Sequence, residues 1–190
     1  MTPRSFAKRD ISFEVDGSGS EVKRTFVIMG SKAPLSSVDS RNIVLRRQTS
    51  FTFDYSVNML IPSGMSDGQS AGITGYYDEN TYLEFGVICR MGKKYIYCNE
   101  HIGDEDKTII AENPLSEGTG KVQLTMRTDY LKRTLSYDST VFTTLENVYY
   151  LCDEGLSRGK RFTGALVGMY AYAGPENDMS VTFIDDHYDE

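Results

Sequence analysis

The sequence predicts an all-β protein folded as an antiparallel sandwich or barrel, and three observations support that prediction. Apolar and polar residues alternate along 51–59, FTFDYSVNM, which is the period of a strand with one buried face. Turn signals rich in Gly, Pro, Asp and Asn recur along the chain at short intervals, as in sandwiches and barrels. No segment has the pattern of a convincing amphipathic helix.

The first expected element is a hairpin of strands 11–15 and 22–29 around the sequence DGSGS. The later strands are expected, from their alternating pattern, at 51–59, 82–89, 94–100, 122–127, 130–137, 165–173 and 180–184. Turn residues separate them at Pro62-Ser63-Gly64, Asp67-Gly68, Asp78-Glu79-Asn80, Gly92, Gly118-Thr119-Gly120, Asp138-Ser139 and Gly174-Pro175. The segment 145–156 is too short and irregular to predict more than a turn or two of helix.

A length of 190 residues predicts one domain that can bury its own core. We expect residues 1–29 to form an N-terminal arm and a hairpin, and residues 30–190 to form the sandwich. There is no internal repeat and no second domain boundary.

The balance of charge argues against two classes of partner. Lys and Arg number 20 against 27 Asp and Glu, and the net charge of -7 repels nucleic acid. No apolar run is long enough to cross a bilayer, and the first ten residues lack the apolar stretch of a signal peptide. We therefore expect neither a nucleic acid nor a membrane as partner, and a cytoplasmic chain, with secretion of a longer parent left open.

The three cysteines are too few for a disulfide scaffold. Cys89 and Cys98 flank an apparent hairpin turn at 91–94, and a symmetric pairing puts Cys89 opposite Ile96 and Cys98 opposite Val87. In that register the two would be diagonal neighbours about 7–8 Å apart, which is too far for a disulfide. With Cys152, they are expected to be three reduced thiols, as in a reducing compartment.

Four blocks of sequence resemble the C-terminal sandwich of family 43 glycoside hydrolases of the β-xylosidase type. In chain order they are RRQTSFTF at 46–53, QSAGI at 69–73 followed by YYD at 76–78, TLSYD at 134–138, and FTGALVGM at 162–169. The resemblance covers about residues 30–190. One departure is Ile184, which stands where that family usually has an acidic residue in its last strand.

This resemblance implies a concanavalin A-like jelly roll that follows a five-bladed catalytic propeller. The chain would then be a non-catalytic accessory domain of an enzyme acting on xylan- or arabinan-derived sugars, and the propeller would be its partner. In such enzymes a phenylalanine of the sandwich reaches across to close the sugar pocket, and the matching position is Phe162. The resemblance leaves a homo-oligomer open.

Two other functions remain open from the residues themselves. A carbohydrate-binding module would stack xylo- or arabino-oligosaccharides on exposed tyrosines, for which the candidates are Tyr76, Tyr77, Tyr170 and Tyr172. A glycosidase in its own right would need two carboxyl groups on either side of the scissile bond. The nearest acidic fragment is Glu176-Asn177-Asp178, but Val181 stands where a third acid would follow, so a solvated loop is favoured.

Arginines and acidic runs give the last candidates. Arg46 and Arg47 are neighbours in an expected strand, so at most one can reach inward, as an anchor of a buried polar network or of the contact with the propeller. Calcium could take oxygen ligands from 100–106 or 185–190, but neither segment has the regular ligand spacing of a dedicated loop. We therefore expect no cofactor, and leave a structural calcium open.

Overall fold

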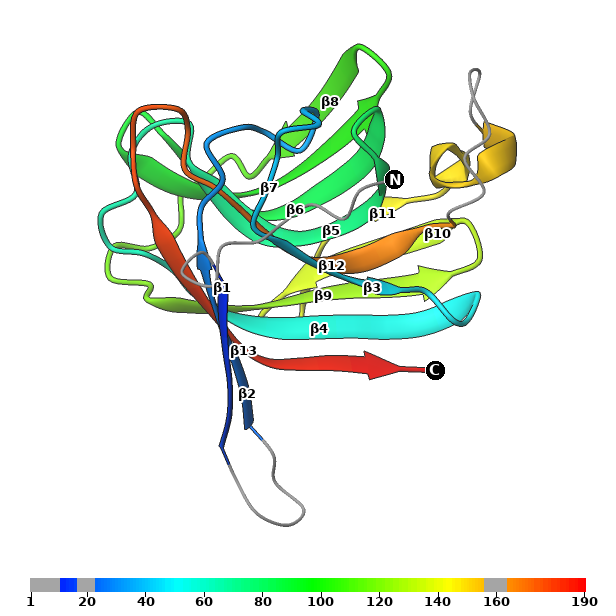
Figure 1. The fold of residues 1–190 in the computed structure, drawn as a ribbon, viewed down its shortest axis with the longest axis horizontal. Coiled ribbons are helices and arrows are strands. Elements are labelled where there is room, and N and C mark those ends of the chain that lie inside the picture. The colour runs from blue at the N-terminus through cyan, green and yellow to red at the C-terminus, as the bar shows by residue number, and fades with distance from the viewer. Residues whose placement is uncertain (1–10, 17–22, 156–163) are drawn as a thin grey trace.

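The computed structural model describes residues 11–16, 23–155 and 164–190, and these form thirteen strands in two stacked antiparallel sheets (Figure 1). The strands of the seven-stranded sheet, in spatial order, are β1 (Ile11–Asp16), β2 (Lys23–Met29), β13 (Ser180–Asp189), β4 (Thr52–Leu60), β9 (Lys121–Asp129), β10 (Lys132–Tyr137) and β11 (Thr140–Leu145). Those of the six-stranded sheet are β3 (Ile43–Arg47), β12 (Leu166–Tyr172), β5 (Ser70–Asp78), β6 (Thr81–Arg90), β7 (Lys93–Ile102) and β8 (Glu105–Ile110). The predicted antiparallel jelly-roll sandwich is confirmed.

Strict alternation marks the strands that face the core on one side. In β4 the side chains of Phe53, Tyr55, Val57 and Met59 are buried against the facing sheet, while the residues between them reach solvent. The same alternation holds in β9. Burial of these apolar faces between two sheets is the main source of stability in such a fold.

The central strands of the six-stranded sheet are buried on both faces. One face packs against the seven-stranded sheet, and the other carries a second cluster of Leu35, Ile43, Tyr76, Tyr82, Ile88, Tyr97 and Tyr170. Leu35 belongs to the connection between β2 and β3, which therefore covers part of this outer face. As a result all nine residues of β5 are buried.

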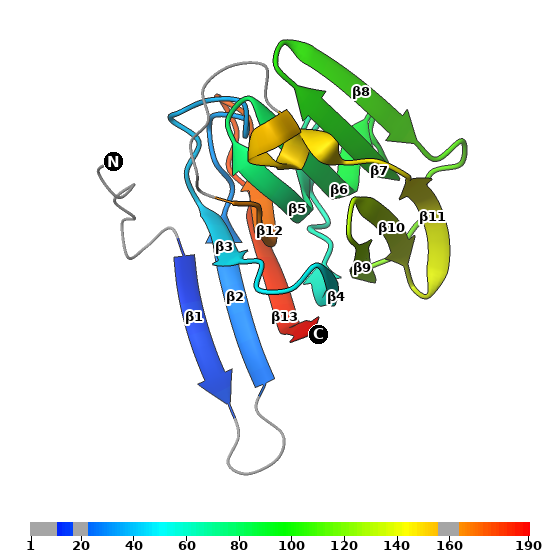
Figure 2. The same cartoon turned by 90° about the vertical axis from the view of Figure 1, so that its right-hand side faces the viewer.

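The hairpin predicted for 11–29 is present as β1 and β2, and it projects beyond the body of the sandwich (Figures 1 and 2). Because β2 also pairs with β13, residues 23–29 are part of the seven-stranded sheet. The arm expected at 1–10 lies outside the described residues. The segment 145–156 holds two short 3-10 turns, Tyr149–Leu151 and Asp153–Gly155, as expected.

The register predicted for the β6–β7 hairpin is wrong by two residues. Arg90 pairs with Lys93, so the turn has only two central residues, Met91 and Gly92, both with positive φ. This is the tight hairpin turn whose twist matches that of the strands. Cys89 thus lies opposite Lys94 rather than Ile96, and Cys98 opposite Phe85 rather than Val87. The three cysteines are free, as expected.

Candidate functional site

One end of the sandwich is hollowed by a cavity of about 470 Å³. Its walls come from the connection between β3 and β4, from the β9–β10 turn, from the 3-10 turns and from the residues that precede β12. Six of the residues that line this cavity are together called the end face: Gln48, Phe51, Thr128, Tyr130, Leu131 and Arg133.

Two aromatic rings stand out from the end face into solvent. Phe51 is 76% exposed and Tyr130 is 66% exposed, and their rings stack with centroids 6.0 Å apart and only 4° between the planes. The Tyr130 amide donates a hydrogen bond of 2.8 Å to the Phe51 carbonyl, which fixes the two turns relative to each other. A rigid, exposed aromatic pair of this kind is typical of an interaction surface.

Behind the rings lies a buried cation. Arg133 is 4% exposed, and its Nη1 donates hydrogen bonds of 2.7 and 3.0 Å to the carbonyls of Tyr130 and Lys132. Its Nε has no partner, and no carboxylate of the described residues forms an ion pair with it. Burial lowers the pKa of this guanidinium to about 10. A buried guanidinium ordinarily has a carboxylate or several carbonyl partners.

Two more polar groups of the cavity wall have no partner among the described residues. Thr128 lies directly opposite Arg133 in the β9–β10 pair, and its Oγ1 makes no hydrogen bond within the described part of the chain. The Nε2 of Gln48 is likewise buried and has no described partner. Leaving such groups unpaired costs about 1–3 kcal/mol each, so within residues 11–16, 23–155 and 164–190 the end face has polar groups left to satisfy.

Arg133 is not among the site residues predicted from the sequence, although its position carries a signal. In β10, Arg133 is two residues before Leu135, which is fully buried, so the period of two points the guanidinium inward. A charged residue on the apolar face of an alternating strand marks a buried polar site.

Phe162, which the resemblance assigns to the sugar pocket, lies outside the described residues. Asp153 and Gly164, which lie on either side of it in the sequence, both line the cavity. The main-chain amide of Gln48 donates a hydrogen bond of 3.3 Å to the Ala165 carbonyl. This bond holds the residues that precede β12 against the cavity wall.

The two arginines singled out in the sequence lie in β3 and point to opposite sides of the six-stranded sheet. The Arg46 guanidinium sits 4.0 Å above the centre of the Tyr188 ring and so bridges β3 and β13 of the opposite sheet. Arg47 lines the cavity of the end face.

Three of the four candidate tyrosines are buried, and they offer no free ring to a glycan from solvent. Tyr77 points into the core and its hydroxyl donates to Asp153. Tyr76 and Tyr170 belong to the outer cluster that includes Leu35, and Tyr170 shares a 2.6 Å hydroxyl contact with Tyr97. Only Tyr172 is half-buried. Local sequence identified strand tyrosines but could not show that the β2–β3 connection covers them.

Carboxyl groups are scarce at the end face. Of the described residues that line its cavity, only Asp153 carries a carboxylate, and it accepts the Tyr77 hydrogen bond. Asp178 is paired with Lys32 at 2.7 Å, and Glu84 lies on the outer face of the six-stranded sheet. Among the described residues, this cavity therefore lacks the two carboxyls on either side of a bond that glycoside hydrolysis needs.

Within residues 11–16, 23–155 and 164–190, no three His, Cys, Asp or Glu side chains gather closely enough to hold a metal ion. The only helices of those ranges are the two 3-10 turns, and neither has the length or apolar character to cross a bilayer.

Comparison with known proteins places this geometry in a family. The sequence profile of the β-xylosidase C-terminal concanavalin A-like domain matches residues 18–186. The GH43 protein BlXynB from Bacillus licheniformis superposes with a TM-score of 0.77 at 23% identity, over 87% of this chain and 32% of that one. Xylan β-1,4-xylosidase from Bacillus halodurans gives 0.77 and 23% over 87% and 33%.

A third solved structure has nearly the same length as this chain. It is a functionally unknown protein from Saccharomyces cerevisiae, with a TM-score of 0.59 at 14% identity over 95% of this chain and 96% of that one. A search of curated protein sequences finds no match. The chain spans about a third of the GH43 chains that it matches first. By the profile match over most of its length, the chain belongs to the β-xylosidase C-terminal concanavalin A-like domain family.

Proposed function

We propose that the chain is a non-catalytic accessory domain that docks through its end face on the catalytic propeller of a family 43 glycosidase of the β-xylosidase or arabinofuranosidase type. The observation that carries the proposal is the buried, carboxylate-free Arg133 behind an exposed aromatic pair. The length of the matching GH43 chains, about three times that of this one, supports a further domain as the partner.

The chemistry of the end face specifies what the partner must bring. The unpartnered groups of Arg133 and Gln48 are donors, so the partner supplies a carboxylate or main-chain carbonyls. Phe51, Tyr130 and Leu131 surround the cavity entrance with apolar surface, which is the composition of an interface core. Excluding water there would strengthen the Arg133 contact.

Docking by the end face also gives Phe162 its role. Asp153 and Gly164, on either side of Phe162 in the sequence, line the cavity, so a partner seated there would lie against the described residues that flank Phe162. Phe162 would then close the sugar pocket of the propeller, and the substrates would be xylan- or arabinan-derived sugars.

The test uses the chain and a separately produced catalytic domain of its parent hydrolase. Isothermal titration should show a complex that is weakened about tenfold or more by Phe51→Ser or Tyr130→Ser, since buried aromatic anchors dominate interfaces. Val141→Ser, an equally exposed apolar residue of β11 away from the end face, is the matched control and should bind as the parent does. Equal weakening by all three variants would contradict docking at the end face.

A second measurement addresses activity. The isolated chain should release no sugar from xylo- or arabino-oligosaccharides, whereas Phe162→Ala in the complete hydrolase should lower turnover or sugar affinity. Sugar release by the chain alone, abolished by a single acid-to-amide change, would replace the accessory function with an enzymatic one.

A further inference from the structure

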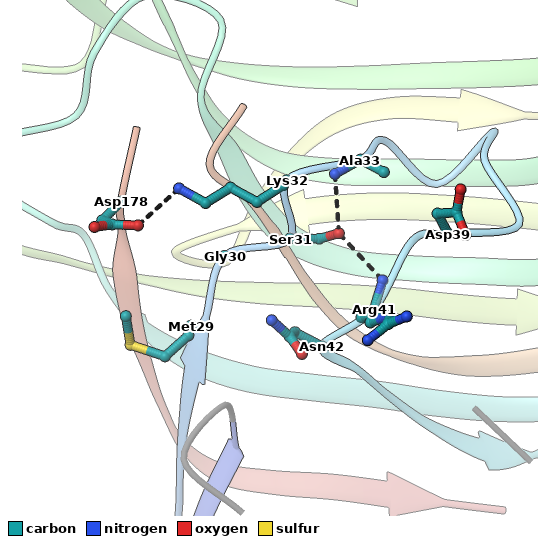
Figure 3. A pocket seen from close by; sticks show the side chains of 9 residues that line it. All are labelled: Met29, Gly30, Ser31, Lys32, Ala33, Asp39, Arg41, Asn42 and Asp178. Atoms are coloured by element: carbon teal, nitrogen blue, oxygen red, sulfur yellow. Dashed lines mark hydrogen bonds and ion pairs between the residues drawn. The ribbon is translucent and has the colours of Figure 1, made fainter. Parts of the chain in front are cut away.

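A second cavity, of about 730 Å³, lies at the start of β3 (Figure 3). The end face adjoins the other end of that strand. The walls of the second cavity are the strap of residues 29–33, which begins with the last residue of β2, together with Asp39, Arg41 and Asn42 before β3 and Asp178 before β13. It shares no residue with the end face.

The strap is held rigidly between the two sheets. The Gly30 amide donates to the Met179 carbonyl at 2.7 Å, and the Ser31 amide donates to the Ala171 carbonyl at 2.8 Å. A Cβ on Gly30 would lie only 2.8 Å from that of Ala173, so the close approach requires glycine. The cavity is therefore formed in advance of any ligand, which lowers the entropic cost of binding.

Ser31 also fixes the opposite wall. Its Oγ accepts hydrogen bonds from the main-chain amides of Ala33, at 3.2 Å, and Arg41, at 3.1 Å (Figure 3). One buried hydroxyl thus joins the strap to the residues that precede β3. The side chains of Arg41 and Asn42 are positioned by this link.

Asn42 is the polar group of the cavity that lacks a partner. Asn42 is 8% exposed, and its side-chain Oδ1 makes no hydrogen bond with any residue that the structure describes. Its backbone is held at a φ of 63°, a left-handed conformation that Asn tolerates better than most residues. An amide carries both donors and acceptors, so its natural complement is a group that can do both.

The charges around Asn42 are balanced. Lys32 is paired with Asp178 at 2.7 Å across the strap, while the exposed Arg41 side chain makes no ion pair or hydrogen bond with the described residues (Figure 3). Asp39 adds a second carboxylate, which gives two cations and two anions in all. Because these four charges sum to zero, the site offers no net electrostatic attraction to a multiply charged anion such as phosphate.

Hydroxyl groups fit this set of partners. A hydroxyl can donate to Asn42 or Asp39 and accept from Arg41 or Lys32 at the same time, and neighbouring hydroxyls can span these groups. None of the described residues that line the cavity carries an aromatic ring, so recognition would come from hydrogen bonds at the edges of the ligand rather than from stacking.

We propose that this cavity binds a neutral, polyhydroxylated ligand, a sugar residue, with Asn42 and Arg41 as its principal contacts. The site goes beyond the accessory function, since it lies away from the end face and needs no catalytic partner. Its failure would leave the docking proposal intact, and failure of docking would leave this site intact.

The test is a titration of the ¹⁵N-labelled chain with D-xylose and xylobiose, followed by amide shifts. Saturable shifts should centre on residues 30–42. Asn42→Gly removes the amide while keeping a residue suited to positive φ, and Arg41→Gln removes the charge; each should weaken binding about tenfold, the value of one or two lost polar contacts. Arg90→Gln, an exposed arginine outside the cavity, is the matched control.

Three results would overturn the proposal. The first is the absence of saturable shifts up to about 50 mM sugar, since binding weaker than this is nonspecific. The second is equal binding by the parent and Asn42→Gly, with unchanged melting temperatures showing that both are folded. The third is tighter binding of inorganic phosphate or D-glucuronate than of D-xylose, which would make the cavity an anion site.

Discussion

Glu84 makes the stability of the chain depend on pH in an unusual direction. It lies in β6 on the outer face of the six-stranded sheet, where Asn99 donates to its Oε2 at 3.3 Å and also to Asp106 at 3.2 Å. Burial, aided by the nearby charge of Asp106 and opposed by the hydrogen bond from Asn99, raises the pKa of Glu84 to about 7. His101 completes the cluster through a 2.7 Å contact between its Nδ1 and Asp106.

The direction of this pH dependence is set by the number of protons that the folded and unfolded states bind. Between the pKa of the unfolded chain, near 4.5, and about 7 in the fold, the folded state keeps a proton that the unfolded state releases. The free energy of unfolding therefore falls as the pH rises through this window and levels off above it. At about 1.4 kcal/mol per pKa unit the loss is at most about 3 kcal/mol, because part of the Glu84 side chain still reaches solvent.

The assay is urea denaturation at pH 5 and pH 8, followed by tyrosine fluorescence because the chain has no tryptophan. Glu84→Gln keeps an acceptor for Asn99 but cannot ionise, so it should be more stable than the parent at pH 8 and should lose most of the pH dependence. Glu117→Gln, in an exposed turn, is the control and should retain it. The reasoning is refuted if Glu84→Gln shows the same difference between the two pH values as the parent.

Three further outcomes follow from packing. Gly86→Ala should lower the free energy of unfolding by about 2–4 kcal/mol in chemical denaturation, because the new Cβ would lie 2.1 Å from the Ala71 carbonyl oxygen. Gly64→Ala is the control: a Cβ there would meet no atom within 4 Å, so the free energy of unfolding should change little. Arg46→Gln should cost about 0.5–1 kcal/mol through loss of the stacking on Tyr188, and an equal loss in Arg90→Gln would contradict that cause. Burial raises the pKa of Cys98 far above its usual range, so a thiol reagent should label it only after unfolding; fast labelling in the native chain would disprove the buried position.

Local sequence is sufficient to predict strands that have one buried face and one solvent-exposed face. The alternation along 51–59 and 122–127 was visible because β4 and β9 bury every second residue. By contrast β5 shows no alternation, since both of its faces are covered, and only the resemblance pointed to it. No strand is predicted at β8, which begins with the charged Glu105 and Asp106, since an edge strand needs few apolar residues.

The candidate site was harder to foresee because it depends on contacts between distant segments. Gln48, Thr128 and Arg133 meet only after β3, β9 and β10 are placed, and no local pattern records that meeting. The burial of two candidate tyrosines was hard to foresee for the same reason. Burial of Tyr76 and Tyr170 is a property of the connection that carries Leu35, more than thirty residues away along the chain.

The order of strands has a consequence for how the polypeptide is made. The last two strands fill interior places, with β12 between β3 and β5 and β13 between β2 and β4. A nascent chain that has not yet emerged past residue 165 therefore holds two split sheets with bare edges, and pairings this distant form slowly. Premature stop codons or proteolysis that remove residues 166–190 should yield insoluble fragments rather than a shortened but soluble sandwich.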